Sequence, residues 1–371
     1  MPGGRRRGPA RPVIWIALVA GAYQVVAILA CVFGRRQKTE DRSQESGVRS
    51  QNLPASILKP VSGADSGLRD AIASHVTLAG EFELLCGVQS LDDPAVAVIR
   101  EFPSVRVVEC RTQTPNAKVG VLADLAAAAR YPILIVNDAD IRVPADYLQR
   151  VTAPLSDPQV GLVTCLYRAK GSTFASRFEG LGVATDFAPS TLVARLVGVD
   201  EFAMGSTMAF RRSDLDRIGG FASIADYLAD DYQLGHRLHG LGLKCALSDV
   251  IVDTRLGGNV WQHQVRWART IRVSKFAGFL GLPVTFATVW AALAAALGDW
   301  RIAVILLAIR MLMAVVAGWF VMRSRDVLLL FWAIPLRDLF GAAVWIAALG
   351  GNTVVWRGKR LRIDREGRIE D

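Results

Sequence analysis

The sequence predicts an α/β domain built on a mostly parallel sheet, with transmembrane helices toward both ends of the chain. In the middle of the chain, short apolar runs alternate with helical patterns, which is typical of a parallel sheet covered by helices. A hydrophobic content of 52% over 371 residues is also high for a soluble chain. The apolar runs occupy residues 55–61, 81–89, 105–110 and 133–138, and helical patterns occupy residues 67–76 and 95–102.

An uncharged apolar segment of 22 residues, 12–33, lies near the start of the chain with arginines on both sides. Because about 20 apolar residues cross a bilayer core, residues 1–33 are predicted to hold an N-terminal transmembrane anchor. A secretory signal peptide is the alternative. The length of the apolar part and the lack of a clear small-residue cleavage site favour the anchor.

Apolar tracts return in residues 279–350, which are predicted to form a second membrane region. The tracts 279–298 and 302–322 are each long enough to span a bilayer, although Arg310 interrupts the second. Residues 351–371 follow as a basic tail.

The third apolar tract of this region, 327–350, contains Pro335, Arg337 and Asp338. It is either a kinked helix with a buried ion pair or a re-entrant segment beside the active site. In both cases Arg337 and Asp338 should face protein or water, because charged groups are costly in lipid.

The formal net charge of +9 is concentrated beside the apolar segments. This placement favours attraction to a membrane surface and excludes nucleic acid as the expected partner. Basic residues that flank membrane spans lie mostly on the cytoplasmic side. This rule places the basic tail in the cytoplasm, and it also favours a cytoplasmic N-terminus because of the N-terminal arginines. If the middle domain is cytoplasmic, the single span before it puts the N-terminus on the other side of the membrane. This conflicts with the N-terminal arginines, so the N-terminal orientation stays open.

Several common chemistries lack support in the sequence. The five cysteines show no CxxC spacing, which predicts neither a zinc site nor a disulfide framework and fits a reducing compartment. The chain contains neither GxGxxG nor a Walker lysine motif, so dinucleotide and P-loop chemistry are not indicated.

The folded domain is predicted at residues 53–278, after a polar linker at 34–52. Asp138 and Asp140 follow its buried strand at 133–136. In open α/β sheets ligands bind at the carboxyl ends of the strands, and paired carboxylates there suit a hard cation that carries a phosphate.

Two further acidic pairs have both a structural and a functional interpretation. Asp92 and Asp93 follow another strand, but they also precede a proline at an expected helix start, where an aspartate acts as a cap. Asp230 and Asp231 begin a predicted helix, where its dipole favours negative charge. A carboxylate at that position could alternatively act as a general base. The basic and aromatic residues of 261–272 fit either a membrane-interface belt or a binding motif.

Taken together and in this order, the motifs resemble the family-2-type glycosyltransferases, specifically the ceramide glucosyltransferase branch that includes hopanoid-lipid glycosyltransferases. The resemblance covers residue 53 to about residue 274 and, less sharply, the membrane tail. It implies a Rossmann-like nucleotide-sugar-binding fold of the GT-A type. The motifs are ILKPVSG, GVQSLDDPAVAVI, NAK, VNDADIRVPADYL, VGLVTCLYR, GSTMAFRR, LADDYQLG and HQVRWARTIR.

The resemblance assigns roles to five residues of the middle domain. Asp92 would contact the nucleotide base or ribose, and Lys118 would lie near the uridine or the phosphates. Asp138 and Asp140 would form the DxD pair that holds Mg²⁺ or Mn²⁺, with Asp140 as the direct ligand. Asp231 would be the catalytic base.

At the C-terminal end of the domain, Arg266 and Trp267 match the RW of the family's (Q/R)xxRW motif, which helps hold the diphosphate and the acceptor. His263 stands where that motif has Gln or Arg and could still donate a hydrogen bond to phosphate. Ser90 stands where relatives often carry an acid, so the nucleotide contact rests on Asp92 or Asp93.

The apolar tracts and the flanking basic residues predict a multi-pass protein of the inner cell membrane with a cytoplasmic catalytic domain, and the resemblance implies its reaction. It would transfer glucose or N-acetylglucosamine from a UDP-sugar to the hydroxyl of a membrane lipid, with inversion. Ceramide and an extended hopanoid are both possible acceptors. A processive polysaccharide synthase and a nonenzymatic membrane receptor with a glycosyltransferase-like domain are the competing hypotheses.

Overall fold

The computed structural model describes residues 10–45, 53–65, 67–356 and 358–370, which form two compact units. The sheet unit consists of Lys38–Lys170, Gly198–Leu256 and Trp356–Asp371. The helical unit consists of Met1–Gln37, Gly171–Val197 and Gly257–Val355. The first arginines of the predicted anchor and linker residues 46–52 lie outside the described residues. The predicted domain at 53–278 contributes to both units.

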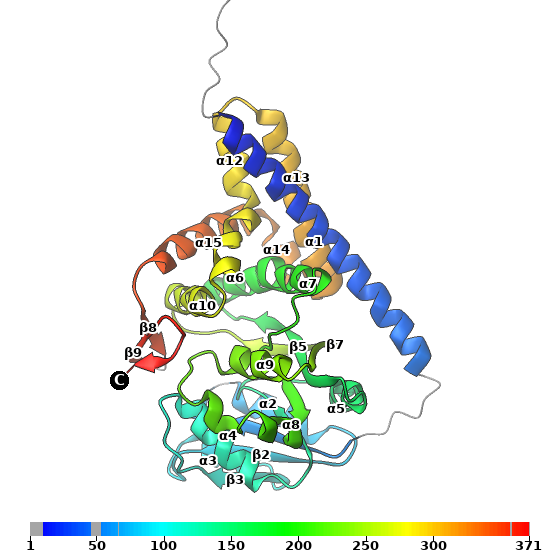
Figure 1. Cartoon of the computed structure of the whole chain (residues 1–371), viewed down its shortest axis with the longest axis vertical. Helices are drawn as coiled ribbons and strands as arrows, with labels where there is room; N and C mark the ends of the chain where they lie inside the picture. Colours follow the sequence, from blue (N-terminus) through cyan, green and yellow to red (C-terminus); the bar gives the residue numbers. More distant parts are fainter. Residues whose placement is uncertain (1–9, 46–52, 66, 357, 371) are drawn as a thin grey trace, which may run out of the picture. The chain divides into compact units, whose positions relative to one another are not determined.

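The sheet unit is built on a sheet of seven described strands in the order β3-β2-β1-β4-β6-β5-β7. Figure 1 labels four of them, β2, β3, β5 and β7. All neighbouring pairs are parallel except those of β6, which runs antiparallel to β4 and to β5. The predicted mostly parallel α/β sheet is therefore confirmed, and each of the four apolar runs forms a strand. The strands are β1 (Ala55–Pro60), β2 (Phe82–Val88), β3 (Val105–Glu109), β4 (Ile133–Val136), β5 (Val160–Lys170), β6 (Met208–Arg211) and β7 (Lys244–Arg255).

Helices cover both faces of this sheet. Successive side chains of a strand point to opposite faces, so Ile57 packs with α2, α3 and α5, whereas Leu58 packs with α4, α8 and α9. Burial on both faces explains why the strands read as continuous apolar runs. The helices and 3₁₀ turns are α2 (Leu68–Val76), α3 (Ala95–Ile99), α4 (Ala117–Ala128), α5 (Tyr147–Thr152), η1 (Ala153–Ser156), α8 (Arg212–Arg217), η3 (Phe221–Ile224) and α9 (Asp230–Gly240).

The predicted basic tail contains folded structure. After β8 (Thr353–Trp356), the strands β9 (Lys359–Ile363) and β10 (Ile369–Glu370) pair antiparallel. The backbone N–H of Ile369 donates to the carbonyl of Asp226 at 2.7 Å, and that of Leu228 donates to Gly367 at 3.1 Å. The tail thereby holds the loop that leads into α9.

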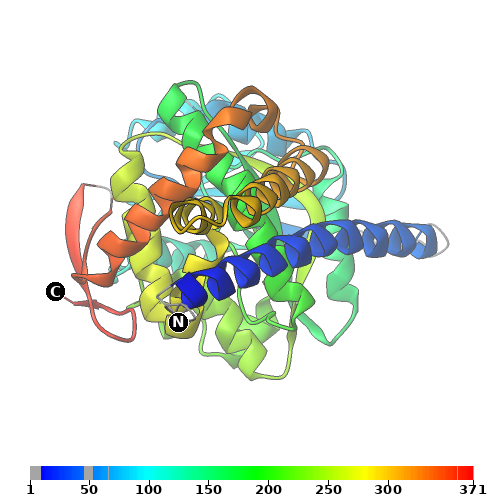
Figure 2. The same cartoon turned by 90° about the horizontal axis from the view of Figure 1, so that it is seen from above.

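The helical unit contains the apolar segments that the sequence assigns to the membrane. In the described part of the chain, three helices are long and apolar enough to cross a bilayer: Pro12–Gly34, Trp300–Val321 and Phe331–Leu349. The first belongs to α1 (Ala10–Glu45), one continuous helix (Figure 2) that reaches into the predicted polar linker. The other elements are α6 (Phe174–Gly182), η2 (Val183–Phe187), α7 (Ala188–Leu196), α10 (Val260–Ser274), α11 (Phe276–Gly281), η4 (Leu282–Thr285), α12 (Ala287–Ala296), α13 (Trp300–Val315), η5 (Val316–Val321), α14 (Asp326–Leu329), η6 (Phe331–Ala333) and α15 (Ile334–Leu349).

The bend in the membrane region lies in a different tract from the one that the sequence suggested. The segments Phe276–Thr285 and Ala287–Ala296 meet at 54°, so the tract 279–298 is broken. Pro283 lies in the 3₁₀ turn η4 at this break, and proline cannot continue an α-helix because it lacks the N–H and its ring clashes with the preceding turn. Pro335, in contrast, lies in the first turn of α15, where proline is tolerated.

The charged pair of the third tract faces protein, as predicted. Arg337 is 6% exposed and Asp338 is 2% exposed. Asp338 pairs with the buried Arg310 of α13 at 2.7 Å and accepts from the Thr288 hydroxyl, also at 2.7 Å. The structure thus matches the alternative of a helix with a buried ion pair.

Candidate functional site

The first turn of α4 places Lys118 at the carboxyl end of the sheet. The side chain of Asn116 caps α4 by accepting from the backbone N–H of Lys118 at 3.1 Å. Its amide donates to the carbonyl of Tyr227 at 2.7 Å. The cap therefore fixes Lys118 to the loop before α9.

Lys118 bridges two carboxylates that come from distant parts of the sequence. Its Nζ lies 2.9 Å from Asp138 Oδ1 and 2.9 Å from Asp230 Oδ2. Burial by itself lowers the pKa of Lys118, but the charges of Asp138, Asp230 and Asp231 outweigh burial and hold this pKa above its usual value. The lysine is therefore a permanent cation at the end of β4.

Asp231 lies beside this cluster in a different environment from Asp230. Its Oδ2 accepts from the backbone N–H of Gly205 at 2.9 Å, and its Oδ1 accepts from that of Tyr232 at 2.8 Å. Burial, and next the negative charge of Asp230, raise the pKa of Asp231 to about 6. A carboxylate with this pKa can accept a proton near neutral pH, whereas Asp230 is engaged by Lys118.

Gly205 is a site residue that residue-by-residue interpretation of the sequence missed. A Cβ at this position would lie 3.3 Å from Asp138 Oδ2, 3.5 Å from Asp231 Oδ2 and 3.6 Å from Lys118 Nζ. The backbone of residue 205 thus passes between the charged groups. The available signal was the glycine that opens the GSTMAFRR motif.

We expect Gly205→Ala to lower the rate of the transfer reaction that the sequence resemblance implies by roughly tenfold, because the new methyl group displaces the Asp138 carboxylate by a few tenths of an ångström. Gly240→Ala is the matched control, since a Cβ there meets nothing within 4 Å. Steady-state rates of the two purified variants test this expectation. Equal rates would show that the space at residue 205 does not matter.

Lys59 of β1 is a second residue that the sequence did not single out. Its buried Nζ donates to the carbonyl of Asp138 at 2.9 Å and to that of Ile141 at 3.3 Å. Desolvation by burial lowers the pKa of Lys59 to about 8. Lys59 therefore fixes the backbone of the segment that carries Asp138 and Asp140.

The two acids of the DAD segment have different partners. Asp138 pairs with Lys118, whereas Asp140 Oδ2 accepts from the Thr254 hydroxyl at 2.5 Å and from the Arg255 backbone N–H at 2.8 Å. Among the described residues, no three His, Cys, Asp or Glu side chains gather as a metal site. Two carboxylates still fit a hard cation by donor chemistry, provided that phosphate and water oxygens complete the shell.

The pair after β2 separates into a structural and an exposed carboxylate. Asp93 accepts from the backbone N–H groups of Gly63, at 3.0 Å, and Ala95, at 2.8 Å, so it fits the capping interpretation. Asp92 is exposed to solvent. The contact of Asp92 with the nucleotide stays a prediction.

The (Q/R)xxRW-like residues lie on α10 in the helical unit. His263, Arg266 and Trp267 are partly exposed, and the rings of His263 and Trp267 are 4.3 Å apart. Gln264 is buried, and its amide donates to Glu179 at 2.8 Å. Residues 263, 266 and 267 share one helix face by their spacing, and the place of His263 at the first motif position stays a prediction.

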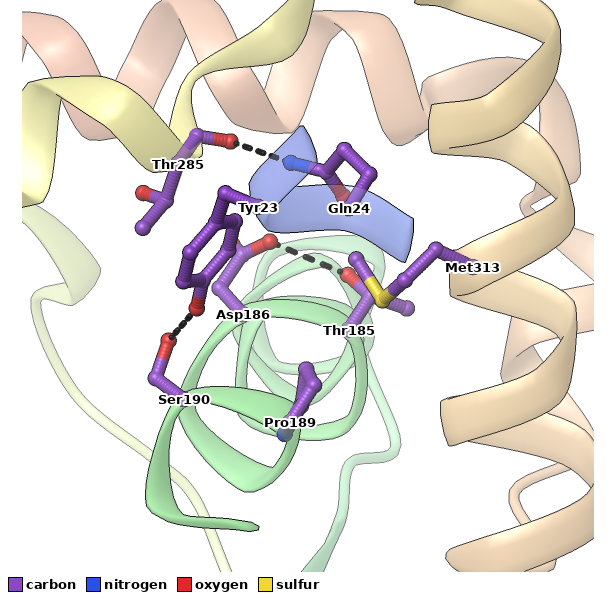
Figure 3. A pocket seen from close by; sticks show the side chains of 8 residues that line it. All are labelled: Tyr23, Gln24, Thr185, Asp186, Pro189, Ser190, Thr285 and Met313. Carbon is purple, nitrogen blue, oxygen red and sulfur yellow. Dashed lines mark hydrogen bonds between the residues drawn. The ribbon is translucent and has the colours of Figure 1, made fainter. Parts of the chain in front are cut away.

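A narrow polar recess also lies in the helical unit (Figure 3). The hydroxyls of Tyr23 and Ser190 are 2.8 Å apart, and Gln24 Nε2 donates to the carbonyl of Thr285 at 3.2 Å. These contacts pair the Tyr23 hydroxyl and the Gln24 Nε2 of α1 with the rest of the unit, whereas Gln24 Oε1 has no hydrogen-bond partner among the described residues. The recess therefore acts as a packing contact of the anchor helix. It is lined by Tyr23, Gln24, Thr185, Asp186, Pro189, Ser190, Thr285 and Met313.

Similarity to known proteins agrees with this geometry. Ceramide glucosyltransferase 1 of Caenorhabditis elegans is 28% identical over 234 residues, which is 60% of this chain and 48% of that protein. The beta-monoglucosyldiacylglycerol synthase of a Synechocystis strain is 27% identical over 46% of this chain and 36% of its own length. The chain thus spans about half or less of the length of these curated relatives.

A solved structure shows the same fold. The mannosyltransferase PcManGT of Pyrobaculum calidifontis, determined with GDP-Man and Mn²⁺, superposes with a TM-score of 0.54 at 17% identity. The match covers 90% of this chain and 99% of that one. The family described as "Glycosyl transferase family 21" matches residues 13–369, nearly the whole sequence. The chain therefore belongs to glycosyl transferase family 21.

Proposed function

We propose that this protein is a membrane-bound inverting glycosyltransferase that moves a hexose from a UDP-sugar to the hydroxyl of a membrane lipid. The observation that carries the proposal is the cluster of Lys118 with Asp138 and Asp230, beside Asp231, whose pKa is raised to about 6, at the carboxyl end of the sheet. That edge is where open α/β sheets bind nucleotides. Family membership supplies the reaction class.

The donor is held by charge and by the loops after the strands. Asp92 binds the nucleotide base or ribose, and the Lys118 cation binds the diphosphate. Asp138 and Asp140 would hold Mg²⁺ or Mn²⁺, which when bound neutralises the charge of the departing diphosphate. On α10, Arg266, Trp267 and His263 contribute to binding of the diphosphate and acceptor.

Transfer is a single displacement. The lipid hydroxyl oxygen forms a bond to the anomeric carbon as the bond from that carbon to the UDP oxygen breaks. The Asp231 carboxylate takes the hydroxyl proton, and the anomeric configuration inverts. The hydrogen bonds from Gly205 and Tyr232 orient this carboxylate.

The acceptor is a lipid alcohol. Ceramide is favoured by the C. elegans relative, and diacylglycerol is the alternative that the Synechocystis relative suggests. An extended hopanoid, glycosylated with N-acetylglucosamine, remains the alternative from the motif resemblance. The apolar helices keep the enzyme at the bilayer, where such a hydroxyl is presented. We place the catalytic domain on the cytoplasmic side of the cell membrane.

Release of UDP by the purified full chain in detergent tests the proposal. UDP-glucose and UDP-N-acetylglucosamine are each offered with ceramide, diacylglycerol or an extended hopanoid, with and without a chelator. We expect release that depends on one acceptor and on metal. A polymeric product without lipid would favour a processive synthase, and no metal-dependent turnover with any lipid would favour a receptor.

Asp140→Asn is expected to abolish most metal-dependent transfer at limiting metal, because the change removes charge with little change of volume. Asp138→Asn should have a milder effect. Titration of Mn²⁺ against both activity and Mn²⁺ binding checks this. Near-normal turnover and Mn²⁺ affinity in Asp140→Asn at limiting metal would contradict the metal assignment.

A further inference from the structure

The C-terminal hairpin, residues 359–370, is hydrogen-bonded to the segment that leads into α9. The backbone N–H of Ile369 donates to the carbonyl of Asp226 at 2.7 Å, and the backbone N–H of Leu228 donates to the carbonyl of Gly367 at 3.1 Å. Both parts belong to the sheet unit. The segment is therefore added to the edge of the hairpin by two backbone hydrogen bonds, one donated by each partner.

Tyr227 carries the side-chain contacts between the hairpin and this segment. Its backbone forms an antiparallel bridge with Arg368, and its hydroxyl accepts from Arg368 Nε at 3.2 Å. The guanidinium groups of Arg368 and of Arg237 in α9 lie 5.5 Å and 5.7 Å from the centroid of the Tyr227 ring. Cations at these distances are attracted by an aromatic ring. Tyr227 therefore joins the hairpin to α9.

The same tyrosine is bonded to the start of α4. Its carbonyl accepts from the Asn116 amide at 2.7 Å, and the backbone N–H of Asn116 donates to the carbonyl of Ala225 at 2.9 Å. Asn116 is fully buried, and its side chain caps α4 by accepting from the backbone N–H of Lys118. The segment held by the hairpin is thus bonded directly to the cap of the helix that carries Lys118.

The charged cluster of the site lies where these two helices begin. Lys118 belongs to the first turn of α4, and Asp230 and Asp231 open α9. Only Ala229 separates Asp230 from Leu228, which the hairpin binds. Because a misplacement of about 1 Å can cost roughly 10²-fold in rate, the position of this segment matters for catalysis.

We propose that the C-terminal hairpin is a positioning element of the catalytic site, and that it acts through Tyr227 to fix the first turn of α9 against the cap of α4. The inference rests on the proposed function, since it assigns a role in that reaction. Arg368 and Ile369 are its positioning residues, because they bind the segment before α9 and act on Asp231 through it.

Ile369→Pro tests the backbone link, because proline has no N–H to donate to Asp226. We expect kcat of the full-length protein in detergent to fall by roughly tenfold, because Asp231 loses its fixed position. The Kd for UDP-sugar, measured by calorimetry, should change by less than about threefold, since Asn116 still caps the helix of Lys118.

Two variants of the same hairpin are the matched controls. Ile369→Val keeps the N–H. Arg365→Pro places a proline at the second position of the turn that the bond from the Gly367 N–H to the Asp364 carbonyl closes, and such a position favours proline. Both should keep kcat within about twofold of the wild type. If kcat of Ile369→Pro falls only as far as the number of UDP-sugar sites per chain falls, fewer chains are folded and the positioning role is overturned.

If Ile369→Pro does not fold, the side-chain link decides. Arg368→Met and Tyr227→Phe each remove the bond between Arg368 Nε and the Tyr227 hydroxyl, so each should lower kcat by about threefold. The double variant should be no slower than Arg368→Met alone, because both changes remove the same bond. An unchanged kcat in both single variants, or losses that multiply in the double variant, would overturn the inference.

Amide hydrogen exchange of residues 225–233 reads the same link without an acceptor. Loss of one backbone hydrogen bond should speed this exchange by roughly tenfold in Ile369→Pro but not in Ile369→Val. A wild type that transfers to no lipid would contradict the proposed function, and the exchange then decides alone: faster exchange supports the role of the hairpin and unchanged exchange overturns it. A wild type that transfers normally, with Ile369→Pro indistinguishable from it, would contradict only the role of the hairpin.

Discussion

Replacing Asp231 with Asn is expected to lower glycosyl transfer by about 10²–10⁴-fold, the usual loss when a positioned general base is removed. Binding of UDP-sugar should stay largely intact, because Asp231 is held by the backbone of Gly205 and Tyr232 rather than by the lysine. Turnover at saturating UDP-sugar, with binding followed separately by calorimetry, measures both quantities.

Asp230→Asn is the control from the neighbouring position. Adjacent residues of a helix point about 100° apart, so the two carboxylates cannot serve one hydroxyl in the same way. Asp230 is the one paired with Lys118, at 2.9 Å. We expect measurable turnover in Asp230→Asn, and a collapse of activity in this variant alone would shift the base assignment by one residue.

The pH profile offers an independent readout of the same pair. Burial and Asp230 raise the pKa of Asp231 to about 6, so the base becomes protonated and transfer falls as the pH drops through this value. Asp230→Asn removes one of the charges that raise the pKa, and the acidic limb should move to lower pH. An unmoved limb would mean that another group controls it.

Lys118→Met is the second substitution with a large expected effect. It leaves Asp138 and Asp230 without their shared cation, and Asp230 is 7% exposed. Removing one partner of a buried ion pair costs about 3–5 kcal/mol, which corresponds to a fall in Tm of roughly 10 °C. Thermal unfolding of the purified variant in detergent checks this, together with the donor KM, which should rise.

Lys118→Arg separates charge from shape. The guanidinium keeps the positive charge but is larger and planar, so thermal stability should lie closer to that of the wild type while donor binding stays impaired. A Lys118→Met protein as stable as the wild type would contradict the bridging role. The carboxylates would then have to be satisfied without the lysine.

Local patterns predicted the core of the sheet unit well. The runs that became β1 to β4 are buried on both faces, and this environment leaves a clear apolar signal in the sequence. The start of α9 at Asp230 was predicted for the same local reason, since the acids and the helix pattern are adjacent. Family membership and the mostly parallel α/β fold are confirmed.

Other features depend on contacts between distant segments and leave little local trace. Gly205 is defined by groups that come from three separate elements, and Lys59 by carbonyls far away in sequence. The basic residues of the tail indicated only its charge. The backbone hydrogen bonds of the tail with residues 226 and 228 could not be predicted from them. The bend at η4 was not predicted. The charged residues beside Pro335 indicated a kink in the third tract, whereas the break lies at Pro283 in the first.

The site assignments also divide between the two compact units. Lys118, Asp138 and Asp231 are brought together in the sheet unit, whereas the motif residues of α10 belong to the helical unit. Sequence order alone gives the motif but not the buried carboxylate Glu179 that contacts it. Four site roles stay predictions, those of Asp92, Asp140, Arg266 and Trp267. Asp140→Asn tests one of them, and substitutions on α10 would test Arg266 and Trp267.

Incorporation of labelled hexose from UDP-sugar into a lipid-extractable product tests the central claim most directly. Wild-type protein and Asp231→Asn are assayed side by side, in detergent with the acceptor panel and Mn²⁺. The account predicts a labelled glycolipid of inverted anomeric configuration from the wild type and about 10²–10⁴-fold less from the variant. A wild type that labels no lipid, or an Asp231→Asn variant that labels lipid at the wild-type rate, would contradict it.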